Sequence, residues 1–231
     1  MVTVCLDDAD AARPHIEATA PDHPSLVDPG HRMDALFGVV NVPSVVWVDE
    51  EGTVVRPPEP GWPGFPRTLP EGFGVLPAMG KTKETPEVDQ RALLNSGQDR
   101  AGYAAALRDW VEHGAASRYA LSPDEVVARS RPAPPEASWA AAHFELAQHL
   151  WQAGRRDLAI PHFNASHLLQ PDNWTYRRQA WSLVAQERDG GPLGRFAQGP
   201  LAGQEADWPF ESDFASDLAQ LGEGEYYPRT L

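Results

Sequence analysis

The chain of 231 residues contains only one cysteine, Cys5. A single thiol cannot form a disulfide within the chain and cannot build a cysteine-rich metal site. Cys5 lies between Val4 and Leu6 in a short apolar run, so we expect it to be buried in a strand and chemically inert. The sequence therefore excludes a fold held together by internal disulfides, and it offers no reactive cysteine.

Basic residues and long apolar runs are also scarce. The chain has 19 Lys and Arg against 33 Asp and Glu, and its formal net charge is −14. Because phosphate binding needs clustered Lys and Arg, we expect no nucleic-acid partner. No apolar run reaches the roughly 20 residues that span a bilayer, and the N-terminal residues lack the pattern of a signal peptide. As written, the sequence predicts a cytoplasmic protein without a membrane span; export of a longer form stays open.

The histidines do not have the spacing of metal ligands. On the expected helices, His143 and His149 are six positions apart and His162 and His167 are five apart. Neither pair has the i, i+4 spacing that would place both rings on one helix face. We therefore predict no metal site and no cofactor.

The first 57 residues alternate between strand and helix patterns. Asp10 can cap the first helix, and Gly38 is suited to end the second. Turn residues 49–52 join the last two apolar runs into a β-hairpin. The order β-α-β-α-β-β predicts a mixed sheet with helices on its faces. The expected strands are Val2–Leu6, Ser25–Asp28, Ser44–Val48 and Thr53–Val55, and the expected helices are Ala11–Thr19 and Arg32–Phe37.

A proline-rich segment and two closing helices follow. Residues 57–86 contain eight prolines, so we expect an irregular insertion over 58–98. Residues 99–130 should contain two closing helices. The second of them begins at Ser122, which caps its first turn, and ends at residues 131–132. The first closing helix, Asp99–Ala115, presents one face for docking on the sheet, made of Tyr103, Leu107, Trp110 and Val111.

A change in periodicity predicts an all-helical part at the C-terminal end. Residues 131–138, RPAPPEAS, have the composition of a linker. Over 139–188 two amphipathic helices separated by Gly154 form a hairpin, and a third helix begins at Trp174. Residues 189–231 are irregular and acidic, which favours a solvated surface. The predicted fold class is α/β plus all-α, a mixed sheet followed by a helical hairpin.

The first 57 residues resemble the second half of a thioredoxin-like domain of the TlpA/ResA and AhpC/TSA kinds. The shared pattern is a strand ended by Asp7-Asp8, the segment Leu26-Val27-Asp28, the turn from Gly38-Val39 to Val42-Pro43, and a strand closing at 49–52. The resemblance implies a cis Val42–Pro43 peptide bond. It also implies that Val42 and Pro43 position a partner polypeptide through the backbone groups of Val42. An ordinary trans proline is the alternative.

The same resemblance identifies a missing element. In such domains a C-x-x-C motif begins a helix whose free N–H groups and dipole lower the thiol pKa. This sequence starts at the strand after that helix. The resemblance therefore implies an incomplete thioredoxin-like sheet with no catalytic residue in this chain. Unpaired central strand edges would make such a chain a poor folder by itself.

Residues 139–171 resemble one tetratricopeptide repeat. Small Ala147 and Ala159 would let two helices approach, and the larger Leu146, Leu150 and Phe163 would fill the groove between them. His143 replaces the tryptophan usual in the first helix. The resemblance implies a protein partner, and the residues expected to bind it are Trp139, His143, Leu146, Phe163 and Trp174.

A wider resemblance covers nearly the whole chain. A group of bacterial ResA-like proteins combines a W-A-x-x-U-G-x-C motif, in which U is selenocysteine, with a similar hairpin, a proline-rich insertion, one helical repeat and a tail that residues 208–228 match. The selenocysteine codon is normally read as a stop. We therefore expect Met1 to be an internal start that follows the motif.

Two functions are compatible with these patterns. The first is a thiol-disulfide oxidoreductase or a thiol or selenol peroxidase, acting on a protein or small-molecule disulfide or peroxide, with its nucleophile encoded upstream. The alternative is a redox-silent module that binds a protein through the TPR-like helices. A Cys or selenocysteine pair upstream of Met1 would favour the first function, and its absence would favour the second.

Overall fold

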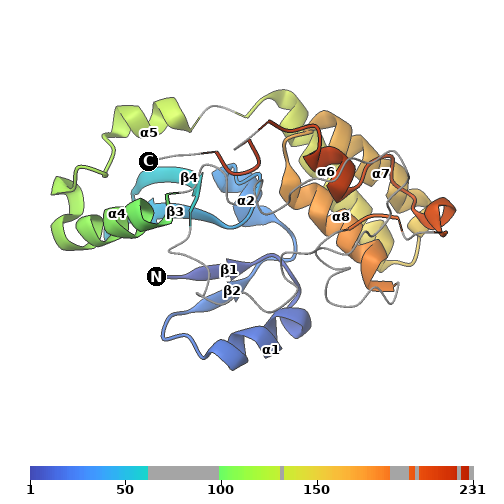
Figure 1. The fold of residues 1–231 in the computed structure, drawn as a ribbon, viewed down its shortest axis with the longest axis horizontal. Coiled ribbons are helices and arrows are strands. Elements are labelled where there is room, and N and C mark those ends of the chain that lie inside the picture. The colour runs from blue at the N-terminus through green and yellow to red at the C-terminus, as the bar shows by residue number, and fades with distance from the viewer. Residues whose placement is uncertain (62–98, 131–132, 188–197, 201–202, 223–224, 229–231) are drawn as a thin grey trace. The chain divides into compact units, whose positions relative to one another are not determined.

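The computed structural model describes residues 1–61, 99–130, 133–187, 198–200, 203–222 and 225–228 (Figure 1). It is a mixed α/β structure that divides into two compact units, Met1–Val39 and Val40–Leu231. The first unit ends within the predicted half-domain of residues 1–57. The loop that contains Val42 and Pro43 therefore belongs to the second unit, together with the C-terminal helices.

The first unit has the predicted β-α-β-α order, with strands β1 (Thr3–Cys5) and β2 (Ser25–Val27) and helices α1 (Ala9–Thr19) and α2 (Arg32–Phe37). The two strands are parallel, with Val4 opposite Leu26. Helix α1 begins two residues before the predicted start, because the Asp8 side chain rather than Asp10 caps it by accepting from the amides of Asp10 and Ala11. Gly38 ends α2 in the left-handed conformation, as predicted.

The prediction of a buried first strand is wrong. Val4 is 38% exposed, Leu26 53% and Val27 40%. Cys5 is only partly buried. Parallel strands are normally covered on both faces by helices and flanked by further strands. Among the described residues no third strand pairs with β1 or β2, so the apolar side chains of this pair stay partly exposed.

The second unit begins with the antiparallel hairpin of β3 (Ser44–Val48) and β4 (Val54–Pro60). Strand β3 has the predicted bounds. Strand β4 continues five residues beyond the predicted end at Val55, so the irregular insertion does not begin at 58. Its prolines are accommodated because the pairing is irregular beside Trp47, and because a strand at the edge of a sheet tolerates residues that lack an amide donor. The rest of the predicted insertion lies outside the described residues.

Helix α4 (Arg100–His113) packs on this hairpin. The Asp99 side chain caps it by accepting from the amide of Gly102, and a 3-10 turn, η1 (Gly114–Ala116), follows. Trp47 stacks on Trp110 with 5.0 Å between ring centroids and donates from Nε1 to the Tyr103 hydroxyl over 3.1 Å. Val111 is 81% exposed, against prediction, because it lies about 80° around the helix from Tyr103, beyond the buried face.

Helix α5 (Pro123–Arg129) starts at the predicted cap. The Ser122 and Glu125 side chains bond reciprocally to the backbone at the helix start, which is a capping box. Helix α6 (Pro135–Gln152) then begins within the predicted linker 131–138. The early start is compatible with Pro135, since proline is well tolerated in the first helical turn. Residues 131–132 lie outside the described part of the chain.

Helices α6, α7 (Arg156–Leu169) and α8 (Trp174–Glu187) form the predicted hairpin and third helix. Gly154 has a φ of 72°, a left-handed conformation that favours glycine at the turn between α6 and α7. Ala147 and Ala159 are fully buried and allow the close approach that was predicted. Leu146 is 42% exposed and so does not fill the groove between the helices, which is a correction.

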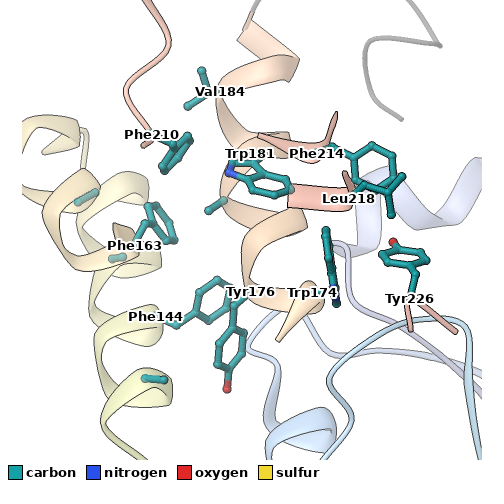
Figure 2. Close-up of a cluster of buried hydrophobic side chains, with 14 of the residues drawn as sticks. Phe144, Phe163, Trp174, Tyr176, Trp181, Val184, Phe210, Phe214, Leu218 and Tyr226 are labelled. Atoms are coloured by element: carbon teal, nitrogen blue, oxygen red, sulfur yellow. The ribbon is translucent and has the colours of Figure 1, made fainter. Parts of the chain in front are cut away.

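The C-terminal tail completes the helical core (Figure 2). It contains a 3-10 turn, η2 (Glu205–Asp207), and the short helix α10 (Phe214–Leu218). The prediction of a solvated surface over 189–231 is therefore wrong for its aromatic residues. Their rings bury a large area and pack edge-to-face with the rings of α7 and α8. In the described part of the tail, the buried hydrophobic residues are Phe210, Phe214, Leu218, Tyr226 and Tyr227.

None of the helices in the described part of the chain combines the length and the apolar character needed to cross a lipid bilayer.

Candidate functional site

The loop that precedes β3 contains the two residues predicted to position a substrate. The Val42–Pro43 peptide bond is cis, which confirms the sequence prediction. The Val42 side chain is 47% exposed, and Pro43 is exposed as well. The preceding residues, Val40 and Asn41, connect this loop to the C-terminal helices.

Val40 attaches the loop to the start of α8. Its carbonyl accepts hydrogen bonds from the amide of Trp174 over 2.6 Å and from the amide of Thr175 over 3.3 Å. The first amides of a helix have no partner within the helix and need acceptors from elsewhere. The Val40 carbonyl supplies one, so the loop caps α8 and is held by it.

Asn41 connects the loop to the tail. It is 9% exposed, and its Oδ1 accepts from the Val42 amide over 2.9 Å. Its Nδ2 donates to the backbone carbonyl of Tyr226 over 2.8 Å. One side-chain amide therefore occupies the N–H of Val42 and holds the tail segment at the same time.

The remaining backbone group of Val42 is also occupied. Its carbonyl accepts a hydrogen bond of 2.7 Å from the Tyr227 hydroxyl. Burial raises the pKa of Tyr227, and the neighbouring Tyr226 acts in the same direction. The phenol therefore stays protonated, and a donor, at neutral and mildly alkaline pH.

Trp174 provides the surface on which the tail rests. Its ring meets that of Tyr226 edge-on at 4.7 Å and that of Phe214 at 6.1 Å. Figure 2 shows these three side chains and Leu218 grouped beside the start of α8. An ion pair of 2.5 Å between Arg177 and Asp217 adds a polar link between α8 and α10.

Cys5, in the first unit, does not have the environment of a nucleophile. Burial raises the pKa of its thiol, and the negative charges of Asp7 and Asp8 add to this effect. The thiol lies 3.7 Å from Oδ2 of Asp7. A reactive thiolate needs a positive environment, so the prediction of an inert Cys5 agrees with this chemistry even though its predicted full burial does not hold.

The residues predicted to bind a protein fall into two groups. Trp139 is 59% exposed and, like Leu146, is available at the surface of α6. Phe163 and Trp174 are 0% and 6% exposed, so they are core residues and their predicted binding role is corrected. Both are large aromatic residues. Aromatic residues at helical spacing more often pack in the core than bind a partner.

His143 belongs to a pair that the sequence analysis missed. Its Nδ1 lies 2.8 Å from Nδ1 of His162, across α6 and α7. The residue spacing contained a signal: His143 precedes Ala147 by one helical turn, and His162 follows Ala159 by nearly one turn. The two helices of a hairpin are antiparallel, so a residue one turn before the contact on α6 lies opposite a residue one turn after the contact on α7. These two rings therefore meet. Only pairs within one helix were considered in the sequence analysis.

A second missed pair lies in the first unit. His31 Nδ1 and Asp34 Oδ2 are 2.7 Å apart, and both side chains are buried. Within the described residues, no group of three or more His, Cys, Asp or Glu side chains is arranged to hold a metal ion.

Comparison with protein-family models, with curated proteins and with solved structures finds no match for this chain. Only its own residues and geometry bear on its function.

Proposed function

We propose that this chain has the function of a thioredoxin-like oxidoreductase that acts on disulfides or peroxides, and that its nucleophile is not among these 231 residues. The reaction would be attack of a thiolate or selenolate on the disulfide or peroxide bond, followed by resolution by a neighbouring cysteine. In this scheme Val42 and Pro43 hold the partner polypeptide beside the reacting sulfur or selenium.

The observation that carries the proposal is the division of the strands into two small sheets. One is the parallel pair β1–β2 joined through α1, and the other is the antiparallel hairpin β3–β4. A thioredoxin-like sheet without its middle strand would leave these two pairs. The exposed apolar side chains of Val4 and Leu26 support this interpretation, because parallel strands are normally interior strands of a larger sheet.

The chemistry of Cys5 supports the second half of the proposal. It is the only cysteine, and its raised pKa keeps it in the thiol form, which does not attack a disulfide. In this proposal Val42 and Pro43 position the substrate, and a residue other than Cys5 supplies the reactive sulfur or selenium.

Activity measurements on two lengths of protein test this function. The 231-residue chain, its Cys5→Ser variant, and a protein extended by the upstream in-frame codons with Cys in place of selenocysteine are assayed for dithiothreitol-dependent reduction of insulin and of hydrogen peroxide. We expect activity only in the extended protein. Activity of the short chain that disappears in Cys5→Ser, or an inactive extended protein, would contradict the proposal.

The second candidate is a redox-silent module that binds a protein. The exposed Trp139 and Leu146, seven positions apart and so on one face of α6, and the 41% exposed Leu158 on α7 favour it, because apolar surface patches mark protein-binding sites. The same extended protein discriminates the two candidates, since a binding module would show no reductase activity at either length.

A further inference from the structure

We propose that the tail segment Glu225–Pro228 is an internal strap that closes the backbone of Val42 against a partner polypeptide and must be released before the partner binds. This inference rests on the proposed function, because it assumes that the partner is held at Val42. It adds a regulatory step to that site, because the strap and the partner would compete for the backbone groups of Val42.

The backbone groups of Val42 carry the inference. A polypeptide that aligns with one residue of an extended segment needs that residue's N–H as a donor and its C=O as an acceptor. Both groups of Val42 are already used, the N–H by Asn41 Oδ1 and the C=O by the Tyr227 hydroxyl. The Val42 side chain is nevertheless 47% exposed, so hydrogen bonding rather than burial closes the loop.

Side-chain hydrogen bonds attach the strap to the loop, whereas backbone hydrogen bonds attach the loop to α8. Two hydrogen bonds join it to the loop, from Asn41 to the Tyr226 carbonyl and from Tyr227 to the Val42 carbonyl, and each uses one side chain. The loop has a separate attachment through Val40 and the start of α8. Release of the strap would therefore leave Val40 in place, free the Val42 carbonyl and let Asn41 rotate away from the Val42 amide.

The burial of the strap provides a readout. Tyr226 and Tyr227 are 4% and 6% exposed, and both would become accessible on release. Chymotrypsin cleaves after exposed aromatic residues. Cleavage between Tyr226 and Tyr227 therefore measures the open fraction when opening and closing are faster than cleavage.

The test compares full-length variants. Tyr227→Phe removes only the hydroxyl, and Asn41→Asp keeps an acceptor for the Val42 amide but loses the donor to Tyr226. Tyr176→Phe, a hydroxyl removal elsewhere in the helical core, is the matched control. The loss of one hydrogen bond should raise the rate of cleavage after Tyr226 by about two- to tenfold in the first two variants, with no change in the control.

Binding of S-carboxymethylated insulin B chain, used as an extended polypeptide probe, is measured on the same proteins. We expect the apparent Kd to fall by the same factor in Tyr227→Phe. Cleavage no faster in Tyr227→Phe and Asn41→Asp than in Tyr176→Phe would overturn the strap. Faster cleavage without any gain in binding would leave the strap as a structural element, and would contradict the assignment of Val42 as the site that positions a partner.

Discussion

The Tyr227 hydroxyl and the Val42 carbonyl, 185 positions apart in the sequence, are joined by a hydrogen bond of 2.7 Å. This bond places the end of the chain on the loop that was predicted to receive a partner. Together with the bond from Asn41 to the Tyr226 carbonyl, it attaches the C-terminal tail to the loop that precedes β3.

The reactivity of Cys5 should be low at neutral pH. Because burial and the negative charge of Asp7 raise the pKa of its thiol, more than the Asp7 backbone amide lowers it, the thiolate fraction at pH 7 is smaller than for a free cysteine. We expect the rate of alkylation by iodoacetamide to rise with pH and to give an apparent pKa above that of glutathione measured alongside. An apparent pKa below the glutathione value would mean that Cys5 is activated.

The stability of the helical part should fall in mild acid because of His167. Burial lowers the pKa of this histidine to about 3, and the positive charge of Arg177 adds to the effect. An unfolded chain binds this proton near pH 6.5, so the stabilising effect of a neutral His167 is complete above pH 6.5 and is lost progressively as the pH falls toward 3. Between pH 6.5 and 5 the loss is about 2 kcal/mol.

Urea unfolding at both pH values measures this loss. His167→Phe should remove most of the pH dependence over this range, while His149→Gln, at an exposed position on α6, should leave it unchanged. Equal pH slopes in the parent and in His167→Phe would show that another group controls acid stability.

The buried ion pair of the β4 strand should be sensitive to removal of one partner. The Arg56 guanidinium makes two bonds to the Glu59 carboxylate, of 2.9 and 2.8 Å, and both side chains are nearly inaccessible to solvent. Glu59→Gln removes the carboxylate charge that faces the buried Arg56 guanidinium, so we expect a loss of about 3–5 kcal/mol in unfolding free energy.

The exposed pair Arg13–Glu17 provides the comparison for this ion pair. Its atoms are 3.9 Å apart, and both side chains are more than half exposed. Glu17→Gln should not change the urea midpoint measurably, because exposed ion pairs contribute little. A Glu59→Gln variant as stable as Glu17→Gln would show that the β4 pair does not stabilise the fold.

Two aromatic residues that the sequence analysis treated alike should behave differently. Phe163→Ala removes a fully buried ring from the helical core and should destabilise the chain by about 3–5 kcal/mol. Trp139→Ala removes a side chain that is 59% exposed, so the change should stay within about 0.5 kcal/mol. Thermal unfolding of both variants is the measurement, and similar losses would place Trp139 in the core as well.

Local features of the fold were predictable because short-range chemistry determines them. Gly38 and Gly154 ended helices where a left-handed residue was needed, and Ser122 with Glu125 marked the start of α5. The position of β3 followed from its β-branched residues after Pro43. The register irregularity that lets β4 run through Pro57 and Pro58 depends on cross-strand packing, and propensity alone argued against it.

The candidate site was predictable only in part. The resemblance to thioredoxin-like domains pointed to Val42 and Pro43, but the hydrogen bond from Tyr227 to Val42 joins the two ends of the second unit. A single sequence has no periodicity that relates such distant positions. The tail was predicted to be solvated because its acids dominate the composition, whereas its buried tyrosines and phenylalanines determine where it packs.

The most direct test of the proposed function is to read the codons that precede residue 1 in the same frame. We predict a Cys codon or an in-frame TGA within a W-A-x-x-x-G-x-C context, which would supply the nucleophile that Cys5 cannot. An upstream reading frame without any Cys or TGA codon before the preceding start would contradict the redox function and leave the protein-binding module as the explanation of this fold.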